Sequence, residues 1–242
     1  MNQSCTAILR TAWAALLPCL LAACQATAAT QPHESASLTL PHELLLTPSA
    51  PEFSRPAPTL FRVEFETTKG KMILEVHRDW APLGTDRFYN LVRAGYYDGA
   101  KFSRIRAGYW AQFGIAADPR IAQAWRNENL PDDPIATPQV SNTRGTVAFA
   151  FAKKDGRTTQ VFINLRDNQA THDHPTDGLP FVPFAKVIEG MDVADHLNTE
   201  YGENAGGGIR GGKQDPVFQG GNAYLEANFP RLDGILHARI LP

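Results

Sequence analysis

Short segments in which apolar and polar residues alternate recur between residues 59 and 242, and this period of two constrains the fold more than any other feature. Leu60 to Thr67 reads L-F-R-V-E-F-E-T, a turn follows at Lys69-Gly70, and Lys71 to His77 alternates again. Because successive side chains of a strand point to opposite faces, each segment predicts a strand with one buried face. Together the two segments predict a β-hairpin.

The remainder of this region contains more strand patterns than helical ones. Helical spacing occurs over Pro82 to Ala94, with Gly95 as a stop signal, and over the shorter segment Met191 to Leu197. Asp118 to Pro138 is predicted to be a long excursion because it contains several prolines. The further predicted strands are Lys101–Ile105, Tyr109–Gly114, Gly145–Ala152, Gln160–Leu165, Phe184–Ile188 and Ile235–Ile240. Many short strands with few helices indicate an antiparallel barrel or sandwich.

The N-terminal residues 1–23 predict export. Arg10 precedes an apolar run from Thr11 to Ala23, which is too short to span a bilayer and fits the central region of a secretory signal. The run ends in Leu21-Ala22-Ala23-Cys24, which resembles the lipobox of bacterial lipoproteins, whose signal is cut before a cysteine that carries the lipid. The alternative is ordinary cleavage after Ala26-Thr27-Ala28.

The composition behind this signal is that of a tether followed by one domain. All three cysteines of the chain lie in residues 1–24, so the domain has none for a disulfide or a zinc site. Residues 24–58 are rich in Ala, Pro, Thr and Ser and predict an extended tether, of which the more apolar Leu38 to Thr47 could dock. Residues 59–242 have the length of one domain. The formal net charge of −2 gives no electrostatic footprint for nucleic acid.

One stretch of the domain carries a chemical pattern. Phe102 to Gly114 reads F-S-R-I-R-A-G-Y-W-A-Q-F-G, in which alternation places Trp110 and Gln112 on one face. We expect Arg104 and Gln112 to meet across neighbouring strands. Gln160 and Phe162 share a face by the same rule. An arginine held among aromatic rings and two glutamines, with no neighbouring carboxylate, suits a neutral amide substrate that carries an apolar ring.

These stretches resemble the cyclophilin-type peptidyl-prolyl cis–trans isomerases. The resemblance rests on F-S-R-I through Q-F-G at 102–114, G-T-V-A-F-A at 145–150, Q-V-F-I at 160–163 and F-A-K-V-I-E-G-M at 184–191. It implies a mainly β fold, an eight-stranded closed antiparallel β-barrel capped by two α-helices. It also implies acceleration of X-Pro bond isomerisation.

The resemblance also assigns roles to residues. Arg104 would be the catalytic arginine, and Gln112 would orient it. The proline pocket would be lined by Tyr109, Trp110, Phe162 and Phe181, and the groove for residues before the proline by Ala150, Phe151 and Gln160. Trp110 stands for a methionine of the family and Phe151 for an asparagine, so we expect a more aromatic pocket and an altered groove. No cofactor and no metal are expected.

The sequence therefore predicts a lipid-anchored isomerase that faces the periplasm and acts as a monomer on proline-containing polypeptides of the cell envelope. Gln25 after the cysteine favours the outer membrane, by resemblance to the sorting rule of bacterial lipoproteins. The alternative from another class is a chaperone or scaffold that binds proline peptides without useful catalysis. A structural envelope lipoprotein with a vestigial site is a third reading, which the presence of the arginine and both glutamines disfavours.

Overall fold

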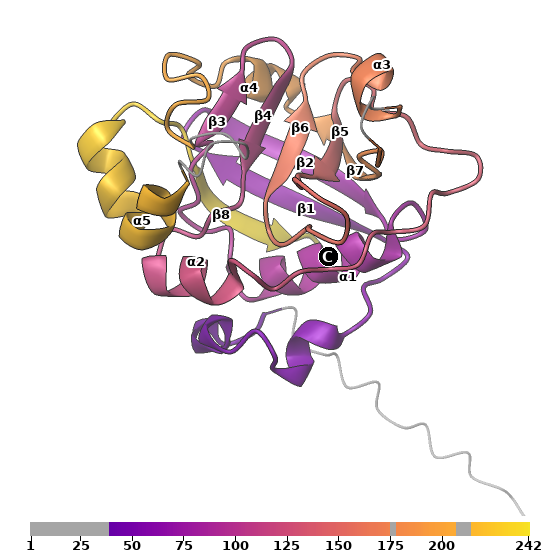
Figure 1. Cartoon of the computed structure of the whole chain (residues 1–242), viewed down its shortest axis with the longest axis horizontal. Helices are drawn as coiled ribbons and strands as arrows, with labels where there is room; N and C mark the ends of the chain where they lie inside the picture. Colours follow the sequence, from indigo (N-terminus) through magenta and orange to yellow (C-terminus); the bar gives the residue numbers. More distant parts are fainter. Residues whose placement is uncertain (1–38, 175–177, 207–213) are drawn as a thin grey trace, which may run out of the picture. The chain divides into compact units, whose positions relative to one another are not determined.

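The computed structural model describes residues 39–174, 178–206 and 214–242, which belong to a compact unit that extends from Ser37 to Pro242. The predicted signal and Cys24 lie outside the described residues. Eight strands form one sheet in the order β3-β4-β6-β5-β7-β2-β1-β8 (Figure 1). The strands are β1 Leu60–Thr67, β2 Gly70–His77, β3 Arg104–Arg106, β4 Trp110–Phe113, β5 Thr146–Phe149, β6 Val161–Asn164, β7 Pro183–Glu189 and β8 Ile235–Ile240.

The predicted hairpin is confirmed. Strands β1 and β2 pair antiparallel from Leu60 opposite His77 to Thr67 opposite Gly70. Along β1 the apolar side chains of Phe61, Val63 and Phe65 are buried, as the period of two requires. The hairpin thus supplies one continuous wall of the core.

The sheet is open, which corrects the closed barrel that the family resemblance implied. Strands β3 and β8 are its two edges, and they do not pair with each other. An isolated bridge between Lys101 and Gly234 and a hydrogen bond from the Phe102 amide to the Asp233 carbonyl (2.9 Å) join the two edges instead. Because β3 has only three residues, the sheet curls around the core without a continuous ladder at its seam.

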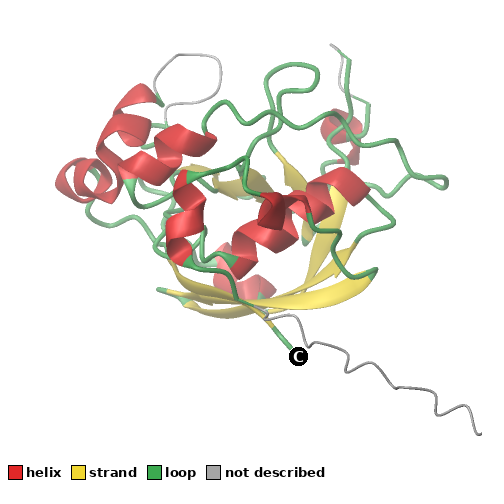
Figure 2. Ribbon diagram, turned by 90° about the horizontal axis from the view of Figure 1, so that it is seen from below, coloured by secondary structure: helices red, strands yellow, loops and turns green. Residues whose placement is uncertain are grey.

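The described residues contain more helices than the two that the resemblance implied. They are α1 Pro82–Arg93, α2 Pro119–Trp125, α3 Gln169–His172, α4 Met191–Asp195 and α5 Asp215–Asn228, with the 3₁₀ helices η1 His42–Leu46 and η2 Pro51–Ser54. Figure 2 looks onto the helices that lie across the curved sheet. Helix α1 closes the core, because its buried Phe88 packs against Phe65 of β1 and Phe184 of β7.

Helices α2 and α5 were not predicted. Helix α2 lies inside the segment that the prolines marked as an excursion, and it begins with Pro119, where a proline is tolerated. It packs against α5, where the Arg126 guanidinium lies 4.5 Å from the centre of the Phe218 ring. Helix α2 has only seven residues, too few for a clear helical period, and Gly220 and Gly221 interrupt the helical pattern of α5.

Residues 39–58, which the sequence assigned to the tether, are docked on the domain. Leu45 in η1 is fully buried, and its carbonyl accepts a hydrogen bond from the indole of Trp125 (2.8 Å). The Asn90 amide donates to the carbonyls of Phe53 (3.1 Å) and Arg55 (2.7 Å). The expectation that the apolar run could dock is confirmed for its described part. No helix among the described residues has the length and apolarity to cross a membrane.

Candidate active site

Strand register brings the predicted arginine, glutamine and phenylalanine into one row. Arg104 of β3 lies opposite Gln112 of β4, and Gln112 lies opposite Phe162 of β6. Phe162 in turn lies opposite Ala148 of β5. The residues between these positions, among them Ile105 and Ile163, belong to the core, so the row lies on the other face of the sheet. The predicted meeting of Arg104 and Gln112 is confirmed.

A chain of amides holds the guanidinium of Arg104. Its Nη1 donates to Oε1 of Gln112 (3.0 Å), and Nε2 of Gln112 donates to Oε1 of Gln160 (2.8 Å). Nε2 of Gln160 then donates to Oε1 of Gln214 (3.1 Å), just before α5. The guanidinium also lies 4.4 Å from the centre of the Trp110 ring. These contacts fix the direction in which Arg104 can donate.

A carboxylate also reaches Arg104, which corrects the expectation that none is near. Nη2 of Arg104 donates to Oε1 of Glu203 at 2.8 Å. The segment that carries Glu203 follows β3 closely, because the Ile105 amide donates to the Gly202 carbonyl (2.8 Å). Burial lowers the pKa of Arg104 and Glu203 raises it, and an arginine stays protonated at neutral pH in either case.

A largely aromatic cluster includes the Ala148 and Phe162 end of the row. Ala148, Ala150 and Phe162 form a buried apolar cluster, on which the partly buried Trp110 and Phe181 pack. The rings of Phe162 and Phe181 meet edge to face, with centres 5.4 Å apart. The predicted pocket residues Trp110, Phe162 and Phe181 are therefore brought together, and they leave a partly exposed apolar surface.

His172 packs against this aromatic cluster, which the sequence did not predict. Its ring lies 5.2 Å from Phe162 and 5.1 Å from Phe181, and its Nδ1 lies 3.2 Å from Oδ1 of Asn164. Burial lowers the pKa of His172, and the charge of Asp173 opposes that shift. The sequence gives no periodic signal for this contact, because the ring is placed by the short helix α3 directly after β6.

Tyr109 lies outside this cluster. Among the described residues its ring contacts two guanidiniums, with Cζ of Arg106 4.3 Å and Cζ of Arg166 3.5 Å from the ring centre. The side chain turns away because Tyr109 precedes β4 in the tight turn from β3, where its amide donates to the Arg106 carbonyl (2.9 Å).

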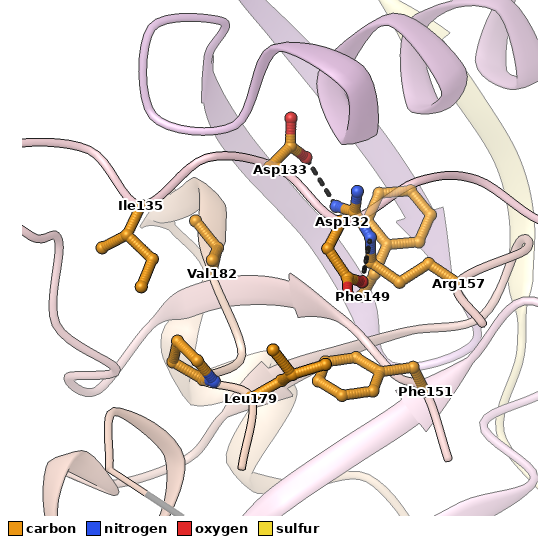
Figure 3. Close-up of a pocket in the computed structure, with 9 residues that line it drawn as sticks. Asp132, Asp133, Ile135, Phe149, Phe151, Arg157, Leu179 and Val182 are labelled. Atoms are coloured by element: carbon orange, nitrogen blue, oxygen red, sulfur yellow. Dashed lines mark hydrogen bonds and ion pairs between the residues drawn. The ribbon is translucent and has the colours of Figure 1, made fainter. Parts of the chain in front are cut away.

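Phe151 connects the aromatic cluster to a neighbouring cavity. Its ring packs on Phe181 with centres 4.7 Å apart and lines a cavity of about 170 Å³ (Figure 3). Figure 3 shows the buried ion pair of Arg157 with Asp133 (2.5 Å) at the edge of this cavity. Asp133 comes from the excursion after α2, so an element outside the sheet shapes this cavity.

The arrangement suits non-covalent chemistry on an amide. A permanently charged, restrained donor stands next to a partly exposed aromatic surface, against which an apolar ring can pack. The row itself consists of Arg104, Gln112, Phe162 and Ala148, none of which is a side chain that acts as an activated nucleophile.

Comparisons with known proteins agree with this geometry. The family model described as cyclophilin type peptidyl-prolyl cis-trans isomerase/CLD matches residues 62–216. Peptidyl-prolyl cis-trans isomerase A of Dickeya dadantii is 34% identical over 164 residues, which cover 67% of this chain and 83% of the relative. Peptidyl-prolyl cis-trans isomerase B of Escherichia coli is 31% identical over 138 residues, which cover 56% and 82%.

A solved structure shows the same fold. A cyclophilin type peptidyl-prolyl cis-trans isomerase of Cryptosporidium parvum superposes with a TM-score of 0.53 at 17% sequence identity. The match covers 76% of this chain and 98% of that chain. The mainly β architecture of eight antiparallel strands with helices is thus shared.

Proposed function

The chain belongs to the cyclophilin-type peptidyl-prolyl cis–trans isomerase family and is an enzyme of that activity, and from this premise we propose that Arg104 is its catalytic donor. The cluster of Trp110, Phe162 and Phe181 would hold the proline ring of the substrate. The single observation that carries this proposal is the row that places Arg104, Gln112 and Phe162 side by side across three strands.

The mechanism follows from the barrier to rotation. Amide resonance sets that barrier at about 18–20 kcal/mol, and rotation about the C–N bond leaves the proline nitrogen with a localised lone pair. Arg104 would donate to the carbonyl of the substrate proline and face this developing lone pair. A preorganised donor stabilises such charge best when it need not reorient, which is what Gln112 and Gln160 provide. A thousandfold acceleration requires about 4 kcal/mol.

The row also gives the bound polypeptide a direction. Arg104 stands at one end of the row and Ala148 at the other. If Arg104 binds the carbonyl of the proline itself, residues that follow the proline leave towards Glu203. Residues that precede it leave towards Ala150, Phe151 and the cavity. Phe151 would therefore shape the selection of residues before the proline.

Exchange NMR on a proline peptide tests the role of Arg104. Arg104→Ala is expected to lower kcat/KM at least about a hundredfold, because a lost donor to developing charge costs roughly 3–4 kcal/mol. Arg62→Ala, which removes an exposed strand arginine, is the matched control. Circular dichroism establishes that both variants fold. Full exchange activity in folded Arg104→Ala would contradict the role, and peptide binding by the wild type without acceleration would favour the chaperone alternative.

We also propose that the protein acts in the cell envelope as a lipoprotein, on proline-containing envelope polypeptides. The support is the apolar run that ends in Leu21-Ala22-Ala23-Cys24. Cys24→Ser is expected to shift the protein from the membrane fraction to the soluble periplasmic fraction, whereas Cys19→Ser should not. Density separation of inner and outer membranes tests the expected outer-membrane sorting. Identical fractionation of wild type and Cys24→Ser would refute the anchor.

A further inference from the structure

Two arginines share one tyrosine at the rim of the active site. Cζ of Arg106 lies 4.3 Å and Cζ of Arg166 3.5 Å from the centre of the Tyr109 ring. The two guanidinium carbons therefore cannot lie more than about 8 Å apart, which is the Debye length at physiological ionic strength. Both side chains belong to exposed residues. Two like charges are thus held close together without full screening.

Neither guanidinium has a counter-charge among the described residues. The neighbouring arginines do: Arg104 pairs with Glu203 and Arg144 with Asp195. Arg166 donates from Nε to the neutral Oδ1 of Asn168 (3.3 Å). The guanidiniums of Arg106 and Arg166 repel each other, and an anion that contacts both of them relieves this repulsion.

The position of Tyr109 is fixed relative to the pocket. Its carbonyl accepts hydrogen bonds from the Leu165 amide (2.9 Å) and from Nδ2 of Asn168 (2.8 Å), which tie the turn to the end of β6. Trp110 of the proline pocket follows Tyr109 directly. Arg106 lies two residues beyond Arg104 on β3, so it is on the same face of the sheet as the catalytic row. The arginine pair therefore borders the path of a bound polypeptide.

We propose that Arg106 and Arg166 form a carboxylate-binding site that recognises an acidic residue of the polypeptide substrate near its proline. This inference rests on the proposed function and adds a substrate class to it. A guanidinium is a planar fork that matches a carboxylate, and a charge-assisted hydrogen bond of this kind is about twice as strong as a neutral one. The stack on Tyr109 keeps both forks oriented before binding, which lowers the entropic cost.

The other charges at this rim set the selectivity. Arg104 has Glu203 as its partner, and Asp167 accepts a hydrogen bond from the Arg144 amide (2.8 Å). Asp167 keeps its negative charge, but the two arginines outweigh this one carboxylate, so the net charge around Tyr109 is positive. An acidic side chain gains from both arginines, whereas a lysine at the same place is repelled.

Peptide pairs that differ by Glu against Gln test the proposal. The pair is made at each of the three positions before and the three positions after the proline, and kcat/KM is measured by exchange NMR. At one position at least, wild type is expected to prefer the Glu peptide by about tenfold, because each of the two exposed arginine contacts is worth about threefold. The preference should fall as salt rises from about 0.05 to about 0.5 M. A Glu to Gln ratio below about twofold at every position would overturn the proposal.

The double variant Arg106→Gln/Arg166→Gln should bring the ratio to about one. Arg62→Gln/Arg239→Gln, which removes the same charge from β1 and β8, should leave it unchanged. If no peptide is accelerated, the proposed function fails. The Kd ratio of the same peptide pairs, measured by calorimetry, then decides the carboxylate site separately. Binding of the wild type to phosphatidylglycerol vesicles that is lost in the double variant, without a preference for Glu peptides, would assign the arginines to a membrane surface and refute the proposal.

Discussion

The negative charge of Glu203, which pairs with Arg104, decides how much of the positive charge of Arg104 a substrate meets. Glu203 accepts from Nη2 at 2.8 Å, and its side chain keeps 47% of its surface exposed. Each Nη nitrogen of a guanidinium carries two hydrogens, so Arg104 can keep both Gln112 and Glu203 and still donate to a carbonyl. The carboxylate nevertheless offsets part of the charge that polarises the amide.

Glu203→Gln is therefore expected to raise kcat/KM by about threefold to tenfold on a neutral proline peptide, because the glutamine keeps the hydrogen-bond acceptor and removes the opposing charge. Exchange NMR measures the effect. Glu226→Gln removes an exposed carboxylate from α5 and is the matched control. A loss as large as that of Arg104→Ala would mean instead that Glu203 holds the arginine in place.

His172 makes the stability of the fold depend on pH. Burial lowers the pKa of His172 below its ordinary value of about 6.5, while Asp173 opposes the shift. The folded state thus binds the proton less readily than the unfolded chain. The contribution of neutral His172 to the free energy of unfolding is therefore complete above about pH 6.5, and it is lost as the pH falls towards the folded pKa.

Urea unfolding of wild type and His172→Gln, from about pH 7.5 to about pH 5, measures this contribution. The free energy of unfolding of wild type should fall more steeply over this range, because only wild type must take up a proton at this site on unfolding. The His172→Gln variant carries every other titrating group, so it serves as the control for wild type. Parallel pH profiles would show that His172 is not coupled to folding.

At the scale of elements, one aspartate anchors the excursion after α2. Asp133 accepts from the amides of Leu83 (2.6 Å) and Gly84 (2.9 Å) at the start of α1, and it pairs with Arg157 (2.5 Å). The Asp133 side chain is fully buried and that of Arg157 is 5% exposed. This contact joins α1, the excursion and the segment before β6 at the edge of the cavity.

Asp133→Ala is expected to lower the free energy of unfolding by about 3–5 kcal/mol, because it removes the fully buried carboxylate that pairs with the buried Arg157 charge and that accepts from two amides of α1. Asp132→Ala is the matched control, since Asp132 lies 3.7 Å from Arg157 and is partly exposed. Its removal should cost about 1 kcal/mol or less. Equal losses in the two variants, measured by denaturant titration, would contradict the anchoring role of Asp133.

At the scale of the whole molecule, the docked residues 39–58 make the domain longer than the range 59–242 that the sequence predicts. Leu45 is fully buried and its neighbour Leu46 is 46% exposed, although both are leucines of the same 3₁₀ helix. Leu45→Ala is expected to lower the free energy of unfolding by about 2–4 kcal/mol, the range for a leucine removed from a packed core. Leu46→Ala should change it by less than about 0.5 kcal/mol. If Leu45→Ala changed the free energy of unfolding as little as Leu46→Ala, the segment would not dock in solution.

Local patterns determined the strands and the centre of the candidate site. Alternation is set by the geometry of the strand itself, so β1, β2 and β8 are found where the sequence predicts them. The same rule anticipated that Arg104 and Gln112 would meet, because each lies on a short strand with an unambiguous face. The family motifs then assigned functions to these positions.

Only the tertiary structure decided what surrounds that centre. Glu203 is 99 residues from Arg104, and neither its segment nor the one that carries Arg166 has a periodic pattern from which its path could be predicted. The open seam, the pair of α2 with α5 and the anchor at Asp133 likewise depend on how separate segments bury each other. A strand's faces follow from its own sequence, whereas the approach of two loops follows from the packing of everything between them.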